Sequence, residues 1–429
     1  MNCTRFAASG RRYLGASMAL VLLGGLSRGP AQEASQEHQM VTVIGEGGIV
    51  QRTKQIYQVK PGPWGELEYF YTYLEAPDSL VDLVPVPSQQ TVWRFPEWKA
   101  EETREFFTQL GLPPELLVEL NEKAVWHISS DGVRVHPTDR VIRDLPIGMR
   151  LKIYQVLRQF EENPFHRNPV IIESGDTASW FADTGISPVA ISAIDQVAYP
   201  LGPSLAFSDL PYLLSLMSSE EEERDLLRAT TRTRTLILRM KVNREADFDS
   251  LRYYWTAGFK YKDILPMLES VQRTEGVERL DVAHLLPPLP RKLLYTYPSL
   301  SVGLTGKYPD SFWTSLNFFE FWPKERYLDT TEVQKEVQES FSRVAPPYRY
   351  GDVLVMIDPG SRRIVHSCIY LADDIVYTKN GPSLLQPWIL MRMPDLVTRL
   401  KTEQAPVIEA WRRNEKPAMN PTQFSEGRQ

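Results

Sequence analysis

Two polar side chains in the C-terminal part of the chain have the types and the order that nucleophilic chemistry needs. Ser311 follows Pro309-Asp310, a pattern that predicts the start of a helix. His366 opens a β-rich run at residues 366–371. A hydroxyl at a helix start gains from the helix dipole and from free backbone amides, and an imidazole can act as its base. We therefore expect Ser311 and His366 to approach within hydrogen-bond distance, about 3 Å.

Cys368 is a second candidate nucleophile beside this pair. It lies two residues after His366 on the same predicted strand, so both side chains share one face. Positions two apart on a strand are about 6.5–7 Å from each other, too far for a direct thiol–imidazole bond. We expect a small buried core residue, and a relocated nucleophile is the alternative.

Three motifs of this region resemble those of a known family. They are Asp310-Ser311, Gly351-Asp352-Val353-Leu354 and His366-Ser367-Cys368-Ile369-Tyr370-Leu371. The chain here resembles the NlpC-type papain-like peptidases of bacterial cell walls. That family has Asp-Cys at a helix start, then Gly-Asp followed by two apolar residues, then His-Val-Gly-Ile-Tyr-Leu. The resemblance covers roughly residues 295–400 and implies a papain-like α+β module.

The resemblance also implies roles for individual residues. Ser311 stands where the family has its cysteine, His366 stands at the base, and Thr378 falls where a third polar residue orients the histidine. Asn380 is the alternative orienting residue. A thiol has a pKa of about 8.5 and can form a thiolate–imidazolium pair, whereas a serine hydroxyl is far more basic and must be activated by general base catalysis. Because Thr378 carries no charge to support His366, we expect a degenerate site.

The resemblance implies several alternative functions. We expect a cell-envelope protein that binds a peptidoglycan peptide or another envelope component without cleaving it, a pseudoenzyme with a hydrolase-like fold. The alternative is an active serine-variant hydrolase or amidase of peptidoglycan peptides, with Ser311 as nucleophile. An acyl-transfer enzyme of the same superfamily is a third possibility, so the sequence leaves open whether the protein is an enzyme.

The N-terminus has the pattern of a secretory signal peptide at residues 1–31. Arg5, Arg11 and Arg12 precede the apolar run 14–26, and small residues follow at the expected cleavage site. A membrane anchor would need about 20 apolar residues, and this run is shorter. We therefore expect an exported protein, periplasmic or extracellular, with no transmembrane segment after cleavage.

Charge and residue content argue against several other classes. Without the four arginines of residues 1–31, the chain has 44 basic and 54 acidic residues and no basic stripe, so we expect no nucleic-acid partner. The six histidines show no metal-ligand spacing, and no phosphate-binding loop is complete, so we predict neither metal nor cofactor.

The predicted organisation is α+β in five segments. After the signal peptide come an extended arm with β-strand (32–91), a mixed, largely helical region of unknown role (92–290), the NlpC-like papain-fold module (291–403) and a polar tail (404–429). Ser219 before four glutamates predicts a helix start, and we expect that helix to reach about Met240. It would place the side chains of Arg224, Arg228, Arg232 and Arg239 outward, in acid–base pairs.

Overall fold

The structure is a computed structural model that describes most of residues 37–414. The described residues are 37–45, 48–83, 90–182, 184–202, 204–242, 246–300, 307–400 and 404–414. For residues 37–45 and 48–54 only the backbone is described. The predicted signal peptide and the residues after 414 lie outside this part of the chain. These described residues group as one compact unit.

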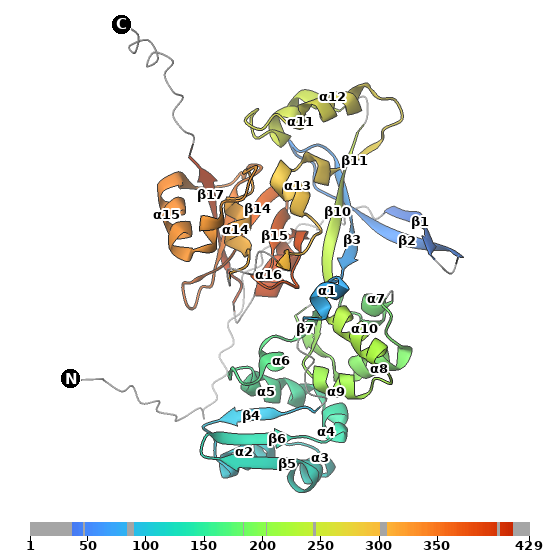
Figure 1. The fold of residues 1–429 in the computed structure, drawn as a ribbon, viewed down its shortest axis with the longest axis vertical. Coiled ribbons are helices and arrows are strands. Elements are labelled where there is room, and N and C mark those ends of the chain that lie inside the picture. Colours follow the sequence, from blue (N-terminus) through green and yellow to red (C-terminus); the bar gives the residue numbers. More distant parts are fainter. Residues whose placement is uncertain are drawn as a thin grey trace, which may run out of the picture. The chain divides into compact units, whose positions relative to one another are not determined.

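The described chain is α+β, with four antiparallel sheets. The first sheet has the order β1-β2-β3-β10-β11. Its strands are β1 (Glu37–Gly45), β2 (Gly48–Gln58), β3 (Leu67–Leu74), β10 (Thr233–Lys241) and β11 (Arg279–Asp281). β3 and β10 run side by side over eight residue pairs, from Thr233↔Leu74 to Met240↔Leu67 (Figure 1). The predicted arm therefore joins a strand that lies more than 150 residues later in the sequence.

Strand β10 corrects the prediction that one helix runs from residue 220 to about Met240. The helix, α10 (Glu220–Thr230), ends at Thr230, and β10 begins three residues later. Leu236, Leu238 and Met240 are each 0% exposed, and the residues between them are less buried. This alternation has the period of a half-buried strand. Threonines at 233 and 235 also favour extended backbone.

In its described residues, the region 78–230 holds two small sheets among short helices. Their strands are β4 (Trp93–Pro96), β5 (Val125–Ser129) and β6 (Gly132–His136), and β7 (Val170–Ile172), β8 (Tyr199–Leu201) and β9 (Ser204–Phe207). The helices are α1 (Asp78–Val81), α2 (Ala100–Gln109), α3 (Pro114–Val118), η1 (Glu119–Lys123), α4 (Asp139–Asp144), α5 (Ile147–Leu157), α6 (Pro164–Arg167), α7 (Thr177–Phe181), α8 (Pro188–Val197), α9 (Leu210–Ser215) and α10.

A fully buried ion pair fixes part of this region. Arg150 of α5 donates to Asp209 (3.2 Å), whose carboxylate also accepts the hydroxyl of Tyr154 at 2.6 Å. Arg150 and Asp209 are both 0% exposed, and Arg150 further donates to the carbonyl of Ile142. These bonds compensate most of the cost of burying the two charges, although the Nε atom of Arg150 has no hydrogen-bond partner among the described residues.

The C-terminal sheet has six strands in the order β12-β17-β13-β14-β15-β16. They are β12 (Phe341–Val344), β13 (Val353–Ile357), β14 (Ile364–Ala372), β15 (Ile375–Lys379), β16 (Trp388–Arg392) and β17 (Val407–Arg413). The accompanying helices are α11 (Phe248–Trp255), α12 (Leu265–Arg273), η2 (Val282–Leu285), α13 (Pro288–Leu293), α14 (Ser311–Leu316), η4 (Glu325–Leu328), α15 (Thr330–Ser340) and α16 (Met393–Leu400). Every strand pair in this sheet is antiparallel.

The position of β17 corrects the predicted polar tail at 404–429. Residues 407–413 pair on one side with β12 and on the other with β13, so they form an interior strand. Arg412 of β17 makes a bidentate ion pair with Asp352, with both N–O distances at 2.7 Å. Asp352 is 1% exposed and also accepts the backbone amide of Arg349. The Gly-Asp motif thus anchors a strand.

One hydrophobic core extends across the predicted boundary at residue 290. It contains Leu236 and Leu238 of β10 together with Ile389 and Leu390 of β16. The hydroxyl of Thr235 donates to the carbonyl of Leu390 (3.0 Å) and accepts its amide (3.1 Å). The C-terminal sheet therefore packs with the first sheet as part of the same core.

Candidate functional site

Helix α14 begins where the sequence predicted it. Asp310 is the N-cap, and its carboxylate accepts the backbone amide of Trp313 at 2.8 Å. Ser311 is the first helical residue and is 5% exposed. A carboxylate at the N-cap satisfies one of the free amides of the first turn. The nucleophile candidate is thus held at a capped helix start.

The hydroxyl of Ser311 contacts β14, at Ser367. Its oxygen accepts the backbone amide of Ser367 at 3.3 Å. One turn later, the hydroxyl of Ser315 donates to the carbonyl of Ser311 (2.9 Å) and lies 3.0 Å from the hydroxyl of Ser367. The side chain of Ser367 therefore faces α14.

His366 is bonded to Thr378, one of the two residues expected to orient it. The Nε2 atom of His366 lies 2.7 Å from the hydroxyl oxygen of Thr378, and both residues are buried, at 3% and 0% exposure. Burial, with a smaller contribution from the charge of Arg399 on α16, lowers the pKa of His366 to about 3. The imidazole is therefore neutral near pH 7.

The expected Ser311–His366 hydrogen bond is not formed among the described residues. Successive side chains of a strand point to opposite faces, and Ser367 faces α14, so His366 faces away from it. Strand β15 gives the same result. Lys379 pairs with Trp388, whose indole donates to Thr314 of α14 at 3.0 Å, so the preceding Thr378 points to the other face together with His366. The prediction of this pair was wrong because β14 presents Ser367, not His366, to the helix.

Of the two remaining predicted residues, Cys368 belongs to the hydrophobic core and Asn380 lies in the loop after β15. Cys368 is 0% exposed, and burial raises the pKa of its thiol well above the usual range. A buried neutral thiol is a core residue and a poor nucleophile. Among the described residues, Asn380 forms no hydrogen bond with His366; its amide nitrogen lies 3.2 Å from the sulfur of Met391.

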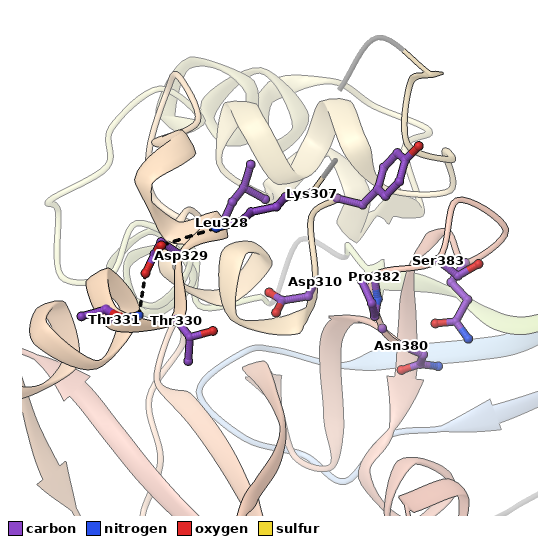
Figure 2. A pocket seen from close by; sticks show the side chains of 12 residues that line it. Lys307, Asp310, Leu328, Asp329, Thr330, Thr331, Asn380, Pro382 and Ser383 are labelled. Carbon is purple, nitrogen blue, oxygen red and sulfur yellow. Dashed lines mark hydrogen bonds and ion pairs between the residues drawn. The ribbon is translucent and has the colours of Figure 1, made fainter. Parts of the chain in front are cut away.

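A groove of about 880 Å³ lies next to the start of α14 (Figure 2). Three segments line it: the residues before α14, the junction of η4 and α15, and the loop after β15. The lining residues are Lys307, Tyr308, Asp310, Leu328, Asp329, Thr330, Thr331, Asn380, Gly381, Pro382, Ser383 and Gln386. Most of them are polar, so the groove offers hydrogen-bond donors and acceptors.

Asp329 organises one side of the groove. Its carboxylate accepts the amide of Thr331 (2.8 Å) at the start of α15 and pairs with Lys307 (3.4 Å), as Figure 2 shows. These bonds lower the pKa of Asp329. The sequence prediction did not include this side, although Asp329-Thr330-Thr331 before an amphipathic run has the composition of a helix start.

Lys379 is the buried residue that sequence reasoning missed. It is 0% exposed, and its ammonium donates to the carbonyls of Gly381 (2.5 Å) and Ser383 (2.9 Å) in the groove loop. Burial lowers the pKa of Lys379 to about 7, and the nearby charge of Asp310 opposes that shift. The sequence signal was a lysine that ends a run of strand residues and precedes Asn380-Gly381.

The part of the chain that the structure describes holds neither a cluster of metal-ligand side chains nor a membrane-spanning helix. There, no three or more histidine, cysteine, aspartate or glutamate side chains gather in a way that could hold a metal ion. Among the same residues, none of the helices has the length and apolar character to cross a bilayer. Comparisons with protein-family models, with curated proteins and with solved structures gave no match to this chain.

Proposed function

We propose that this is an exported cell-envelope protein whose residues 291–403, completed by β17, form a degenerate NlpC-type papain-like module. In this proposal the module binds a peptidoglycan peptide, or another peptide component of the envelope, without cleaving it. The observation that carries the binding part of the proposal is the polar groove at the start of α14, which Asp310 and Asn380 help to line. The separation of Ser311 from His366 speaks against cleavage.

The order of the elements supports the papain-like part of the proposal. A short helix that starts at Ser311 packs against an antiparallel sheet, and that sheet carries Gly351-Asp352 and His366 in the expected order. Thr378, twelve residues after His366, contacts the histidine as the resemblance implies.

The electrostatics of the site support binding over cleavage. A serine nucleophile needs a base that takes its proton during attack. His366 faces away from Ser311, and Thr378 occupies its Nε2 atom. The hydroxyl of Ser311 instead accepts the amide of Ser367.

The size and lining of the groove support a peptide ligand. A volume of about 880 Å³ lies within the usual range of small-molecule and peptide sites, about 300–1,000 Å³. The side-chain oxygens of Asn380 and Gln386 are buried and lack hydrogen-bond partners among the described residues. An unsatisfied buried acceptor costs about 1–3 kcal/mol, and a ligand amide or a water molecule would remove that cost.

A binding experiment with soluble peptidoglycan fragments tests the proposal. We expect the purified chain to bind the fragments saturably in calorimetry, and mass spectrometry should find them unchanged after incubation. Thr330→Arg should abolish binding, because Thr330 is exposed and a long side chain there would fill the groove. Gln338→Arg is the matched control, since it adds the same charge to an exposed position of α15 outside the groove.

The same incubation also tests the hydrolase alternative. The wild-type chain, Ser311→Ala and His366→Ala should all leave the fragments intact. New fragments that appear with the wild type and vanish with Ser311→Ala would show that Ser311 is a working nucleophile. Equal affinity of the wild type and Thr330→Arg, or no binding at all, would remove the groove as the ligand site.

A further inference from the structure

Lys379 is unusual in the core because its amino group is buried and, among the described residues, forms no hydrogen bond or ion pair with a carboxylate. The residue is 0% exposed, and its ammonium donates to the backbone carbonyls of Gly381 and Ser383. The desolvation of an ammonium disfavours folding unless its bonds compensate. Stabilisation of the fold therefore does not explain why a lysine lies at this position.

The hydrogen bonds of Lys379 indicate its role. Both carbonyl acceptors, Gly381 and Ser383, lie in the loop after β15, and both residues line the groove. The same loop contributes Asn380, Pro382 and Gln386 to the lining. The described backbone bonds within this loop are few: Gly381 donates to Lys379, and Gln386 donates to Ser383 at a long 3.3 Å. Charge-assisted bonds to the carbonyls thus hold the loop where backbone bonds do not.

The surroundings of Lys379 leave its charge adjustable. Among the described residues, Asp310 before α14 is the charged group whose field acts on Lys379, and it favours the ammonium. Trp388 of β16 places its ring centroid 5.7 Å from Nζ, which also favours a cation. Burial opposes both and is the largest influence, so the pKa of Lys379 falls to about 7.

We propose that Lys379 is a positioning residue that holds loop 380–386 as one wall of the groove, more firmly when it is protonated than when it is neutral. This inference rests on the proposed function for its biological meaning, since the wall belongs to the proposed ligand groove. The effect of Lys379 on the loop can be tested without a ligand. Binding of an envelope peptide should then weaken as pH rises through neutrality.

The stability of the whole protein should change in the opposite direction. Between pH 7 and 10.5 the unfolded chain keeps a proton on this lysine that the folded chain has lost, so the unfavourable contribution of Lys379 diminishes as pH rises. Replacement by methionine, which has similar length and no charge, should raise the urea midpoint of unfolding while it loosens the loop. These opposite effects separate a positioning role from a merely structural one.

Hydrogen exchange followed by mass spectrometry tests the proposal on the full chain. We compare the wild type, Lys379→Met and the control Lys335→Met, which removes an exposed lysine of α15. After correction for intrinsic exchange, the amides of 381–386 should exchange about tenfold faster in Lys379→Met, because charge-assisted bonds to the loop are lost. In the wild type their protection should fall between about pH 6 and about pH 8, around the pKa of Lys379.

Three outcomes overturn the proposal. They are wild-type protection of 381–386 that does not change with pH, equal protection in Lys379→Met and wild type, and equal loosening in Lys335→Met. If Lys379→Met does not fold, the pH series of the wild type decides alone. A failure to bind peptidoglycan fragments would refute the proposed function and leave this result intact, because the exchange experiment contains no ligand.

Discussion

Individual side chains in this site are placed by strand alternation more than by their order in the sequence. Ser311 and His366 have the expected order, but one residue of register sends His366 to the far face of β14 and gives Ser367 to α14. The sequence showed that His366 and Cys368 share a face, and it could not show which face meets the helix. That choice depends on packing between elements far apart in the chain.

The burial of His366 predicts that the protein becomes less stable at acid pH. The pKa of His366 is about 3 in the folded protein against 6.5 ordinarily, so the unfolded chain binds more protons between these values. The free energy of unfolding should therefore fall as pH drops from 6.5 towards 3, by up to about 1.4 kcal/mol per pH unit for this group. His366→Gln should flatten that slope in urea titrations at several pH values.

The exposed residue His127 provides the control for this prediction. His127→Gln should leave the slope as it is in the wild type. An identical pH dependence in His366→Gln and wild type would mean that His366 is protonated in the folded protein. His166 is also buried, with its pKa lowered to about 3, so it should supply part of the slope that remains.

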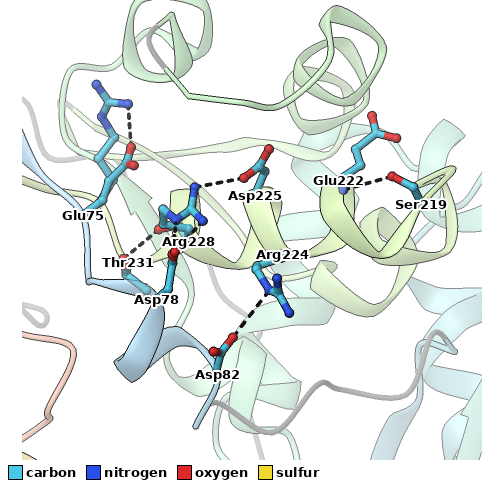
Figure 3. Close-up of polar contacts among 10 residues, drawn as sticks. Glu75, Asp78, Asp82, Ser219, Glu222, Arg224, Asp225, Arg228 and Thr231 are labelled. Atoms are coloured by element: carbon cyan, nitrogen blue, oxygen red, sulfur yellow. Dashed lines mark hydrogen bonds and ion pairs between the residues drawn. The ribbon is translucent and has the colours of Figure 1, made fainter.

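Whole elements were predictable where local signals agree, as α10 illustrates. Its N-cap Ser219 accepts the amide of Glu222 at 3.2 Å, and Arg224 and Arg228 pair with Asp82 and Asp78 (Figure 3). These pairs confirm the acid–base interpretation of the outward arginines at those two positions. The prediction failed past Thr230, because the periodicity changes from 3.6 to 2 without a glycine or proline to mark the end.

Strand β17 was missed for a related reason. Its sequence, Val407-Ile408-Glu409-Ala410-Trp411-Arg412-Arg413, alternates weakly and ends in two arginines, so it reads as part of a polar tail. Only its neighbours explain it. Ala410 is buried between β12 and β13, and Arg412 pairs with the buried Asp352. Long-range pairing of this kind leaves little trace in a local pattern.

Truncation of the chain before β17 tests the role of this strand. A chain that ends at Gln404 lacks β17 and should lose the cooperative unfolding of the C-terminal sheet, because β12 and β13 lose their shared partner and Asp352 keeps an unpaired buried charge. Because the side chain of Arg412 is 30% exposed, loss of this ion pair alone should cost less than the about 3–5 kcal/mol typical of a fully buried pair. A chain that ends at Asn414 keeps β17 and is the control. Thermal unfolding followed by circular dichroism compares the two, and equal midpoints would contradict the assigned role of β17.

At the scale of the whole molecule, the predicted module at 291–403 is not an independent core. Tyr295 donates to the carbonyl of Leu236 in β10 (2.6 Å), and Tyr254 of α11 donates to that of Leu371 in β14 (2.6 Å). A polar cluster adds to the connection: Glu173 after β7 binds Arg399 of α16 at 2.8 Å. The predicted boundary at residue 290 gave no sign that the C-terminal sheet shares a core with β3 and β10.

This shared interior predicts how fragments behave. Residues 291–414 expressed alone should be poorly folded, because the apolar side chains that meet β10 would be exposed to water. Residues 36–414 should unfold in one transition that includes both sheets. Dispersed proton NMR signals from the shorter fragment, comparable with those of the longer one, would show that the module folds without β3 and β10.

The late position of β17 in the chain also has a consequence during synthesis. Strands β12 and β13 leave the ribosome before the strand that must lie between them has been translated. The nascent chain therefore cannot close its largest sheet until residues 407–413 emerge, and until then it stays in an open state. A protein of this topology completes its fold only after translation has passed residue 413.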